Sequence, residues 1–188
     1  MRISCSGMRV NLRTPEQEDA GEIARNANDY DIAKDVASSG EFPYPYTTQD
    51  AMAFIGSSAG ARSAGIGYHF VICVGKPVIG ACGLFNISAR NRSCDIGYWI
   101  GKGHWGKGYA KEAVLILLQF GFGSLQLNRI QAYTFASNSR SVSLLKSMGF
   151  STEGVLRESV VQEGRYVDDM LFSKLAREHK ALSISIDG

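Results

Sequence analysis

The chain has 188 residues, of which 45% are hydrophobic and 20% are charged, and its formal net charge is +2. This length and composition predict a single globular domain over 1–188, with a loose leader at 1–7 and a tail at 177–188. The small net charge offers no basic surface for direct nucleic-acid binding, and the apolar run 113–118 is too short to cross a membrane. Residues 1–8 lack the apolar stretch of a signal peptide, so we expect a cytoplasmic protein.

The first predicted strand covers residues 8–13, where apolar and polar side chains alternate. Met8 is an alternative start of the chain to Met1. A helix is expected directly after this strand, because Thr14 is a favourable N-cap and Pro15 suits the first helical position. Gln17 is expected to close a capping box with Thr14.

Further helices are expected before the central strands. A short helix is predicted over 28–40, followed by the aromatic, proline-stiffened loop 41–46. Another helix should begin near Thr47 or Thr48 and end in the Ser/Gly/Ala-rich stretch 56–65.

The rest of the chain alternates between strands and helices. Three antiparallel strands are predicted at 67–74, 78–87 and 94–100. A helix, a strand, a second helix and a long hairpin should follow, at 110–121, 129–135, 138–148 and 150–176. This order predicts an α+β fold built on one mixed sheet.

A glycine-rich turn joins the third central strand to the next helix, and such a turn presents backbone N–H groups to an anion. Gly101, Gly103 and Gly106 spell the dinucleotide fingerprint G-x-G-x-x-G. That motif requires an acidic residue about 20 positions later, and residues 113–152 contain neither Asp nor Glu. The dinucleotide interpretation therefore fails.

A P-loop is excluded as well, because Gly101, Gly106 and Lys107 are followed by Gly108 rather than by a hydroxyl residue that could hold Mg²⁺. A third interpretation takes 105–110 as the turn, with small residues that let a pyrophosphate approach the amides. A plain glycine-rich turn without a ligand remains the alternative for this motif alone.

The segment 105–110 resembles the pyrophosphate loop of the GNAT N-acetyltransferases, whose pattern is Gln/Arg-x-x-Gly-x-Gly/Ala. The chain departs from that pattern at Trp105. Tryptophan at this position, Gly-Tyr-Trp at 97–99 and Glu-Ala at 112–113 resemble the Rim-type branch, which includes the ribosomal-protein N-terminal acetyltransferases. The segment 138–150, with N-x-x-S followed by G-F, resembles a helix of the same branch.

This resemblance covers the chain from Met8 to Ala176 and implies a GNAT-like fold, with about seven strands in a mostly antiparallel sheet flanked by helices on both faces. It implies acetyl-CoA as the cofactor. The residues expected to bind the coenzyme are Trp99, Ile100, Gly101, Trp105, Gly106, Lys107, Gly108, Tyr109, Ala110, Lys111, Asn138 and Lys146. Asn138 is also a plausible N-cap, and both roles are compatible.

The implied reaction is acetyl transfer from a thioester to an amine. A peptide α-amine, with a pKa of about 8, needs only a modest base, whereas a lysine amine near about 10.4 needs a stronger one. Asp95 and Glu158 are the candidate bases, although each is equally consistent with a solvated carboxylate. Many GNAT enzymes place a tyrosine acid where this chain has Leu145. The resemblance implies that the Ser141 hydroxyl contacts the sulfur instead, and a serine packed or solvated on a helix face is the alternative.

The acceptor is expected to contact a set of aromatic and basic residues, although core packing explains such a cluster equally well. These candidates are Phe42, Tyr44, Tyr46, Tyr133, Arg157 and Tyr166. The expected acceptor is a protein or peptide N-terminus; the alternatives are a small-molecule amine (an amino acid, a polyamine or an antibiotic) or a non-catalytic acyl-CoA-binding module. The chain is expected to be a monomer or a homodimer.

Neither a disulfide framework nor a metal site is predicted. The four cysteines form no C-x-x-C pair, and the three histidines show no ligand spacing. Three of the cysteines fall among apolar residues in predicted strands, which favours buried free thiols.

Overall fold

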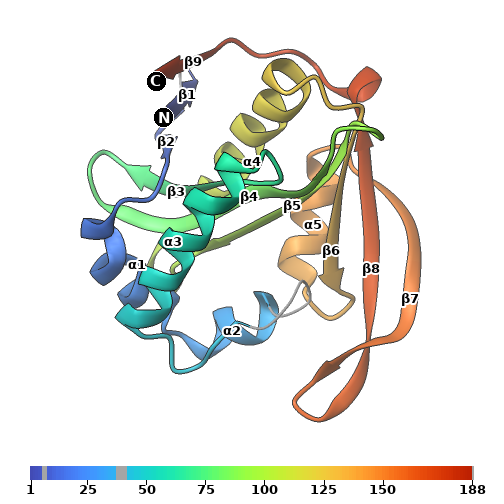
Figure 1. Ribbon diagram of the computed structural model, residues 1–188. Helices are drawn as coiled ribbons and strands as arrows, with labels where there is room; N and C mark the ends of the chain where they lie inside the picture. The colour runs from blue at the N-terminus through green and yellow to red at the C-terminus, as the bar shows by residue number, and fades with distance from the viewer. Residues whose placement is uncertain (6–7, 37–41, 188) are drawn as a thin grey trace.

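A computed structural model describes residues 1–5, 8–36 and 42–187. The described strands form one sheet in the order β7-β8-β6-β5-β4-β3-β2-β1-β9 (Figure 1). Their bounds are β1 Arg2–Cys5, β2 Val10–Arg13, β3 Tyr68–Val74, β4 Val78–Ser88, β5 Ser93–Ile100, β6 Arg129–Phe135, β7 Ser151–Gln162, β8 Arg165–Leu175 and β9 Ile184–Asp187. Neighbouring strands are antiparallel except β5 and β6, so the predicted mixed, mostly antiparallel sheet is confirmed.

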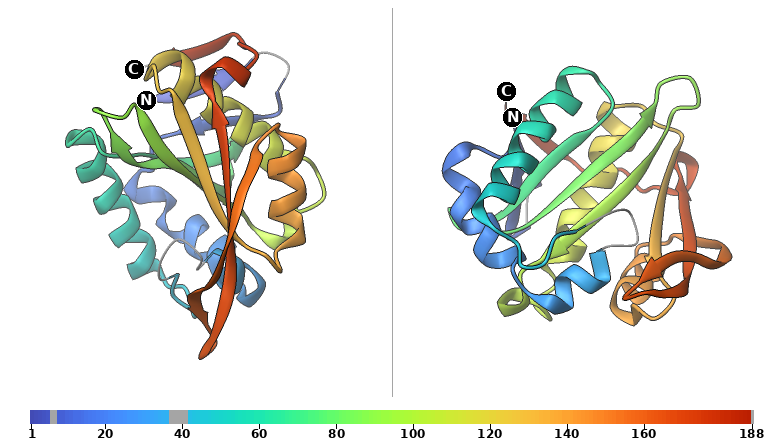
Figure 2. Two further views of the ribbon diagram at one scale, coloured as in Figure 1. Left: turned by 90° about the vertical axis from the view of Figure 1, so that its right-hand side faces the viewer. Right: turned by 60° about the horizontal axis from the view of Figure 1, so that its bottom comes forward.

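Helices cover both faces of this sheet, as expected. They are α1 Ala20–Ala27, α2 Tyr30–Val36, α3 Thr48–Ser63, α4 Tyr109–Gln119 and α5 Ser139–Ser147, with 3-10 turns η1 Gln17–Asp19, η3 Lys102–His104 and η5 Ala176–Glu178 and a π-helical turn η4 Phe120–Ser124. One apolar core joins α1 and α3 to one face, and a larger core joins α4 and α5 to the other. Figure 2 shows α3 and α5 on opposite sides of the sheet. Within the described ranges, no helix is long and apolar enough to span a membrane.

The two ends of the chain form strands, which corrects the predicted leader at 1–7 and tail at 177–188. β1 and β9 pair with each other from Arg2↔Asp187 to Cys5↔Ile184, while residues 6–7 and 188 lie outside the described residues. Ile3 is fully buried, so β1 contributes to the core. The described sheet therefore has nine strands rather than the predicted seven or so. The sequence did not predict β1 and β9 because a four-residue strand is too short to show a clear alternation of apolar and polar side chains.

The first helix begins later than the pattern at 14–17 predicts, so the expected Thr14 cap is wrong. Glu16 is the N-cap of the 3-10 turn η1, and its N–H donates to the Asp19 carboxylate at 2.8 Å. Both terminal nitrogens of Arg13 hold the same carboxylate at 2.6 Å. This ion pair holds Asp19, the last residue of η1, against Arg13 at the end of β2, and the α-helix starts only at Ala20.

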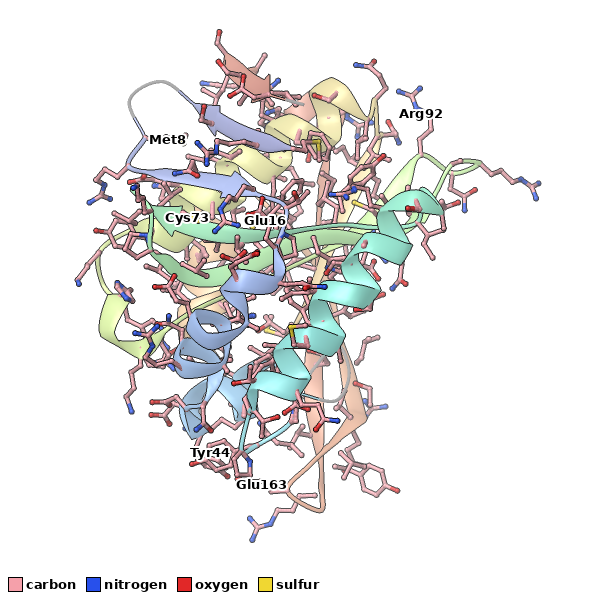
Figure 3. All side chains as sticks on the ribbon, turned by 60° about the vertical axis from the view of Figure 1, so that its left-hand side comes forward. Met8, Glu16, Tyr44, Cys73, Arg92 and Glu163 are labelled. Carbon is pink, nitrogen blue, oxygen red and sulfur yellow. The ribbon has the colours of Figure 1, made fainter. Side chains whose placement is uncertain are left out.

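Other predicted boundaries are confirmed. Thr47 caps α3 in a reciprocal capping box with Asp50, and Asn138 caps α5 by accepting the Ser141 N–H at 3.1 Å. The helix predicted over 28–40 is α2 in its described part, while 37–41 lies outside the described residues. The three cysteines predicted to be buried, Cys73, Cys82 and Cys94, are buried and free; Figure 3 labels Cys73 on β3.

The feature that positions the site is the divergence of β5 from β6. These strands pair in parallel only from Ser93↔Arg129 to Asp95↔Gln131. Beyond that point β6 follows β8 as far as Phe135↔Asp169, whereas the rest of β5 remains paired with β4. A gap therefore opens in the middle of the sheet beside the C-terminal half of β5.

Candidate active site

A cavity of about 910 Å³ lies at this gap, a size that suits a small ligand, since such pockets measure roughly 300–1,000 Å³. On one side it is lined by the end of β5, the loop 104–111 and the start of α5. On the other side it is lined by α2, α3 and the strands β3 and β4. It therefore joins the glycine-rich turn to the opposite face of the sheet.

The loop between η3 and α4 is shaped by two glycines in the left-handed region. Gly106 has φ +74° and Gly108, the N-cap of α4, has φ +81°. Side chains with a Cβ rarely adopt this conformation. Among the described residues, the backbone N–H groups of 106–111 have no acceptor. These amides and the N-terminus of an eleven-residue helix form a cradle for an anion.

Arg9 braces this loop from the strand side. Its Nη2 donates to the Lys107 carbonyl at 2.7 Å, and its Nε donates to Glu112 Oε1 at 2.8 Å. Burial opposes the charge of Glu112, but the bonds from the Arg9 side chain and from the N–H groups of Arg9 and Val10 keep its pKa below the ordinary value. Glu112 is thus engaged in holding the helix start, and it is not a free base.

Some of the aromatic and basic residues on the loop and on α5 line the cavity, and others do not. Trp105 donates its indole N–H to the Ile100 carbonyl at 2.6 Å, and the Arg140 guanidinium lies 3.9 Å from the centre of the Trp105 ring. Trp105 and Lys111 line the cavity, whereas Lys107 and Lys146 do not. Arg140, which also lines the cavity, was missed by the sequence analysis.

One hydrogen bond to β4 shows which backbone groups of β5 face away from β4 and into the gap. Gly101 N–H donates to the Ile79 carbonyl of β4 at 2.8 Å, so the Gly101 amide is engaged. Because backbone groups alternate along a strand, Trp99 also points its amide toward β4, and Tyr98 and Ile100 point theirs into the gap. The Ile100 carbonyl already accepts from Trp105.

The start of α5 presents polar groups to the same gap. Asn138 uses Oδ1 for capping, and its Nδ2 has no acceptor among the described residues. The Ser141 hydroxyl lies 3.0 Å from the Tyr98 hydroxyl. Burial raises the pKa of Tyr98 to about 12, partly offset by the Ser141 bond, so this phenol is protonated at neutral pH. Leu145 is fully buried.

His69 lies on the opposite side of the cavity. Its ring lies over Gly83, where a Cβ would be 2.9 Å from Nδ1, and it stacks on Phe85 with centroids 6.3 Å apart. Phe54 contacts the ring edge-on at 5.9 Å. Burial lowers the pKa of His69, which keeps the imidazole neutral at pH 7.

Three described carboxylates line the acceptor side, and all are engaged. Two are held by basic side chains and one by a helix cap: Asp31 by Lys34 at 2.6 Å and Lys102 at 2.7 Å, Asp35 by Arg140 at 2.9 Å, and Asp50 by Thr47 at 2.8 Å.

The two carboxylates predicted as bases do not line the cavity. Asp95 accepts from Asn86 at 2.7 Å and from Gln131 at 2.8 Å, so each of its oxygens has a partner. Gln131 Nε2 also lies 3.4 Å from the Tyr133 hydroxyl, which places Asp95 behind the lining residue Tyr133. Glu158 is exposed on β7.

The predicted acceptor residues separate in the same way. Phe42, Tyr46 and Tyr133 line the cavity. Tyr44 is 55% exposed, and Figure 3 shows it at the outer surface of the molecule. Arg157 and Tyr166 also lie outside the lining, because the long hairpin β7–β8 extends beyond the body of the sheet (Figure 2).

Two cavity residues besides Arg140 were missed. Tyr98 stands inside the Gly-Tyr-Trp segment, and strand alternation would have placed it on one face with Ile96 and Ile100. His69 carried no such signal, because its place over Gly83 depends on the register of β3 and β4.

Comparison with known proteins gives consistent results. A family model described as "Acetyltransferase (GNAT) domain" matches residues 9–151. The "Uncharacterized N-acetyltransferase p20" of Bacillus licheniformis is 37% identical over 174 residues, covering 91% of this chain and 95% of that protein. Mycobacterium smegmatis RimJ in complex with CoA-disulfide has a TM-score of 0.88 at 23% identity, covering 97% of this chain and 90% of that chain. Spermidine N-acetyltransferase from Vibrio cholerae, in complex with CoA and spermine, has a TM-score of 0.78 at 25% identity, covering 90% and 97%.

Proposed function

This chain belongs to the GNAT acetyltransferase family and is an acetyl-CoA-dependent N-acetyltransferase, and we propose that its acceptor is the N-terminal α-amine of a protein or peptide. The Rim-type motifs at 105–113 and 138–150 support this acceptor. RimJ, which shares the fold, is one of the similar structures.

The observation that carries the proposal is the state of the carboxylates on the acceptor side. The described lining carboxylates are already engaged: Asp31 and Asp35 pair with basic side chains, and Asp50 is held by the uncharged Thr47 at the cap of α3. Ion pairs and hydrogen bonds hold the pKa values of Asp31 and Asp50 below the ordinary value, so neither is the stronger base that a highly basic amine needs. An α-amine, with a pKa of about 8, is already neutral in roughly one molecule in ten at pH 7, whereas an amine near about 10.4 is almost fully charged. The site therefore favours the α-amine.

Acetyl-CoA supplies the activated acetyl thioester. The free amides of 106–111 suit its pyrophosphate, and Lys111 adds attraction for negative charge. The gap-facing backbone of Tyr98 and Ile100, together with the free Nδ2 of Asn138, suits the amide groups of the pantetheine arm.

Two groups are assigned to the chemistry. The Ser141 hydroxyl stabilises the leaving sulfur by hydrogen bonding. His69 accepts the amine proton through water, because it is neutral and lines the cavity. Asp95 and Glu158, the carboxylates suggested by the sequence, would need to act from outside the lining.

A small-molecule amine is the second candidate. The similarity to a spermidine N-acetyltransferase favours it at the level of fold and family. A polyamine carries several positive charges, and two of the three described lining carboxylates, Asp31 and Asp35, already have lysine or arginine partners. Only Asp50 offers a charge without a basic partner, which makes the site a poor match for several positive charges.

The experiment is free-thiol release from acetyl-CoA with a matched acceptor panel. The panel contains peptides with a free N-terminus, the same peptides with a blocked N-terminus and an internal lysine, free amino acids and spermidine. We expect release with the free N-terminal peptides and none with the blocked ones. Release stimulated by spermidine or amino acids alone would replace the proposal with the second candidate. Tight coenzyme binding without release for any acceptor would indicate a binding module.

A further inference from the structure

Two hydroxyl groups from different elements meet on the loop side of the cavity. Tyr98 projects from β5 and Ser141 from the first turn of α5, and their oxygens are 3.0 Å apart. Both residues line the cavity. Among the described residues, no other hydrogen bond is made by either hydroxyl, so each retains capacity for one more partner.

The strand geometry explains why a tyrosine reaches this point. Alternation along β5 places Ile96, Tyr98 and Ile100 on the face covered by α4 and α5. The position on α5 where many GNAT enzymes carry a tyrosine is Leu145, which is fully buried in that core. The chain therefore brings a phenol to the loop side of the cavity from the strand rather than from the helix.

We propose that Tyr98 is a positioning residue, which donates its hydrogen bond to Ser141 Oγ and thereby directs the Ser141 hydroxyl toward the leaving sulfur. The proposal rests on the proposed function, since it assigns a second hydroxyl to the same site. A hydroxyl that accepts one hydrogen bond becomes a stronger donor in the next. The pair then stabilises a thiolate better than Ser141 alone.

The proton balance agrees with donation rather than transfer. The amine nitrogen bonds to the acetyl carbon, the carbon–sulfur bond breaks, and its electron pair remains on sulfur. Burial raises the pKa of Tyr98 to about 12. A thiol has a pKa of about 8.5, so full transfer from the phenol is unfavourable by roughly three orders of magnitude. Both hydroxyls keep their protons, and the amine proton leaves on the acceptor side.

The first test is a double-mutant cycle with Tyr98→Phe, Ser141→Ala and the double variant. Tyr98→Phe removes only the hydroxyl, and we expect kcat to fall about tenfold, with KM for acetyl-CoA unchanged. In the Ser141→Ala background the same change should alter kcat less than about twofold, because its effect passes through Ser141. Tyr68→Phe is the matched control, since Tyr68 packs against Phe120 outside this cavity and should behave as wild type.

The second test needs no acceptor and reports on the coenzyme thiol itself. Calorimetry compares the dissociation constants of CoA and desulfo-CoA, which lacks the sulfur, between pH 7 and 9. In the wild type, binding of CoA should strengthen relative to desulfo-CoA as the thiol ionises, and Tyr98→Phe should remove most of that gain, about tenfold at pH 9. Binding of desulfo-CoA should not change.

Two results would overturn the proposal. One is an equal weakening of CoA and desulfo-CoA by Tyr98→Phe, which would make the hydroxyl merely structural. The other is a full Tyr98→Phe effect in the Ser141→Ala background, which would mean that Tyr98 acts without Ser141. Failure of the proposed acceptor would appear separately, as absent acetyl transfer by a wild-type protein that still distinguishes CoA from desulfo-CoA.

Discussion

Replacing Gly108 with glutamate tests whether the loop binds the coenzyme pyrophosphate. Gly108 has φ +81°, and a Cβ there would lie 3.3 Å from Arg9 Nη2. The left-handed conformation costs a residue with a Cβ about 1–2 kcal/mol, a small part of a total stability of about 5–15 kcal/mol, so the variant should fold. Gly108→Ala carries the same backbone cost without the charge and is the matched control.

The effect on binding follows from the added charge. Two unit charges about 4 Å apart repel by about 1 kcal/mol in water and by about 4 kcal/mol at an effective dielectric of 20. A pyrophosphate carries about two charges, so the glutamate should weaken binding by at least about 2 kcal/mol, or roughly 30-fold in Kd. Arg9 offers little relief, because Glu112 already occupies its guanidinium.

The assay is calorimetric titration with CoA, with thermal unfolding as the check on folding. Gly108→Ala should bind within about tenfold of the wild type, since it suffers only the backbone strain. Gly108→Glu should be weaker than Gly108→Ala by a further factor of about 30. Equal affinities of the two variants would refute the assignment of the pyrophosphate to this loop.

Three further predictions concern other residues. Asn138→Asp keeps the capping oxygen but loses the Nδ2 donor, so it should keep the melting temperature and weaken CoA binding, whereas Asn138→Ala should lose both, including about 1 kcal/mol of stability. Asp169 is 2% exposed and burial raises its pKa to about 6, so its contribution to stability is lost as pH rises from about 4 through 6. Asp169→Asn should therefore melt about 3–8 °C higher than wild type at pH 8 and equally at pH 4 in calorimetry. His69→Gln should lower kcat at least about tenfold at pH 7 with KM for acetyl-CoA unchanged, and steady-state kinetics that show no loss would exclude His69 as the proton acceptor.

The features that the sequence predicted correctly are those encoded by neighbouring residues. The caps at Thr47 and Asn138 each need only a side chain and an N–H three positions away. The hairpin turn at 162–165 and the stop of α5 before Gly149 are similarly local. The cap at Thr14 failed because Arg13 forms a partly buried ion pair with Asp19, and that competing contact outweighed the local preference.

The features that were missed depend on contacts between distant segments. β1 and β9 pair across almost the whole chain, and neither four-residue segment has a pattern of its own. The place of His69 over Gly83 requires the register of two strands. The contact of Tyr98 with Ser141 spans 43 positions and requires the packing of α5 on the sheet.

These differences explain why the chemistry is easier to derive than the acceptor. The residues proposed to hold the coenzyme come mainly from two contiguous segments, 105–111 and 138–141. The acceptor side is assembled from α2, the loop before α3, α3 itself and the strands β3 and β4, and each of these elements contributes between one and four lining residues. A change at Phe42 or Phe54 can therefore alter the acceptor side while the coenzyme loop keeps every bond that shapes it. Acceptor preference can diverge within such a fold while coenzyme binding stays constant.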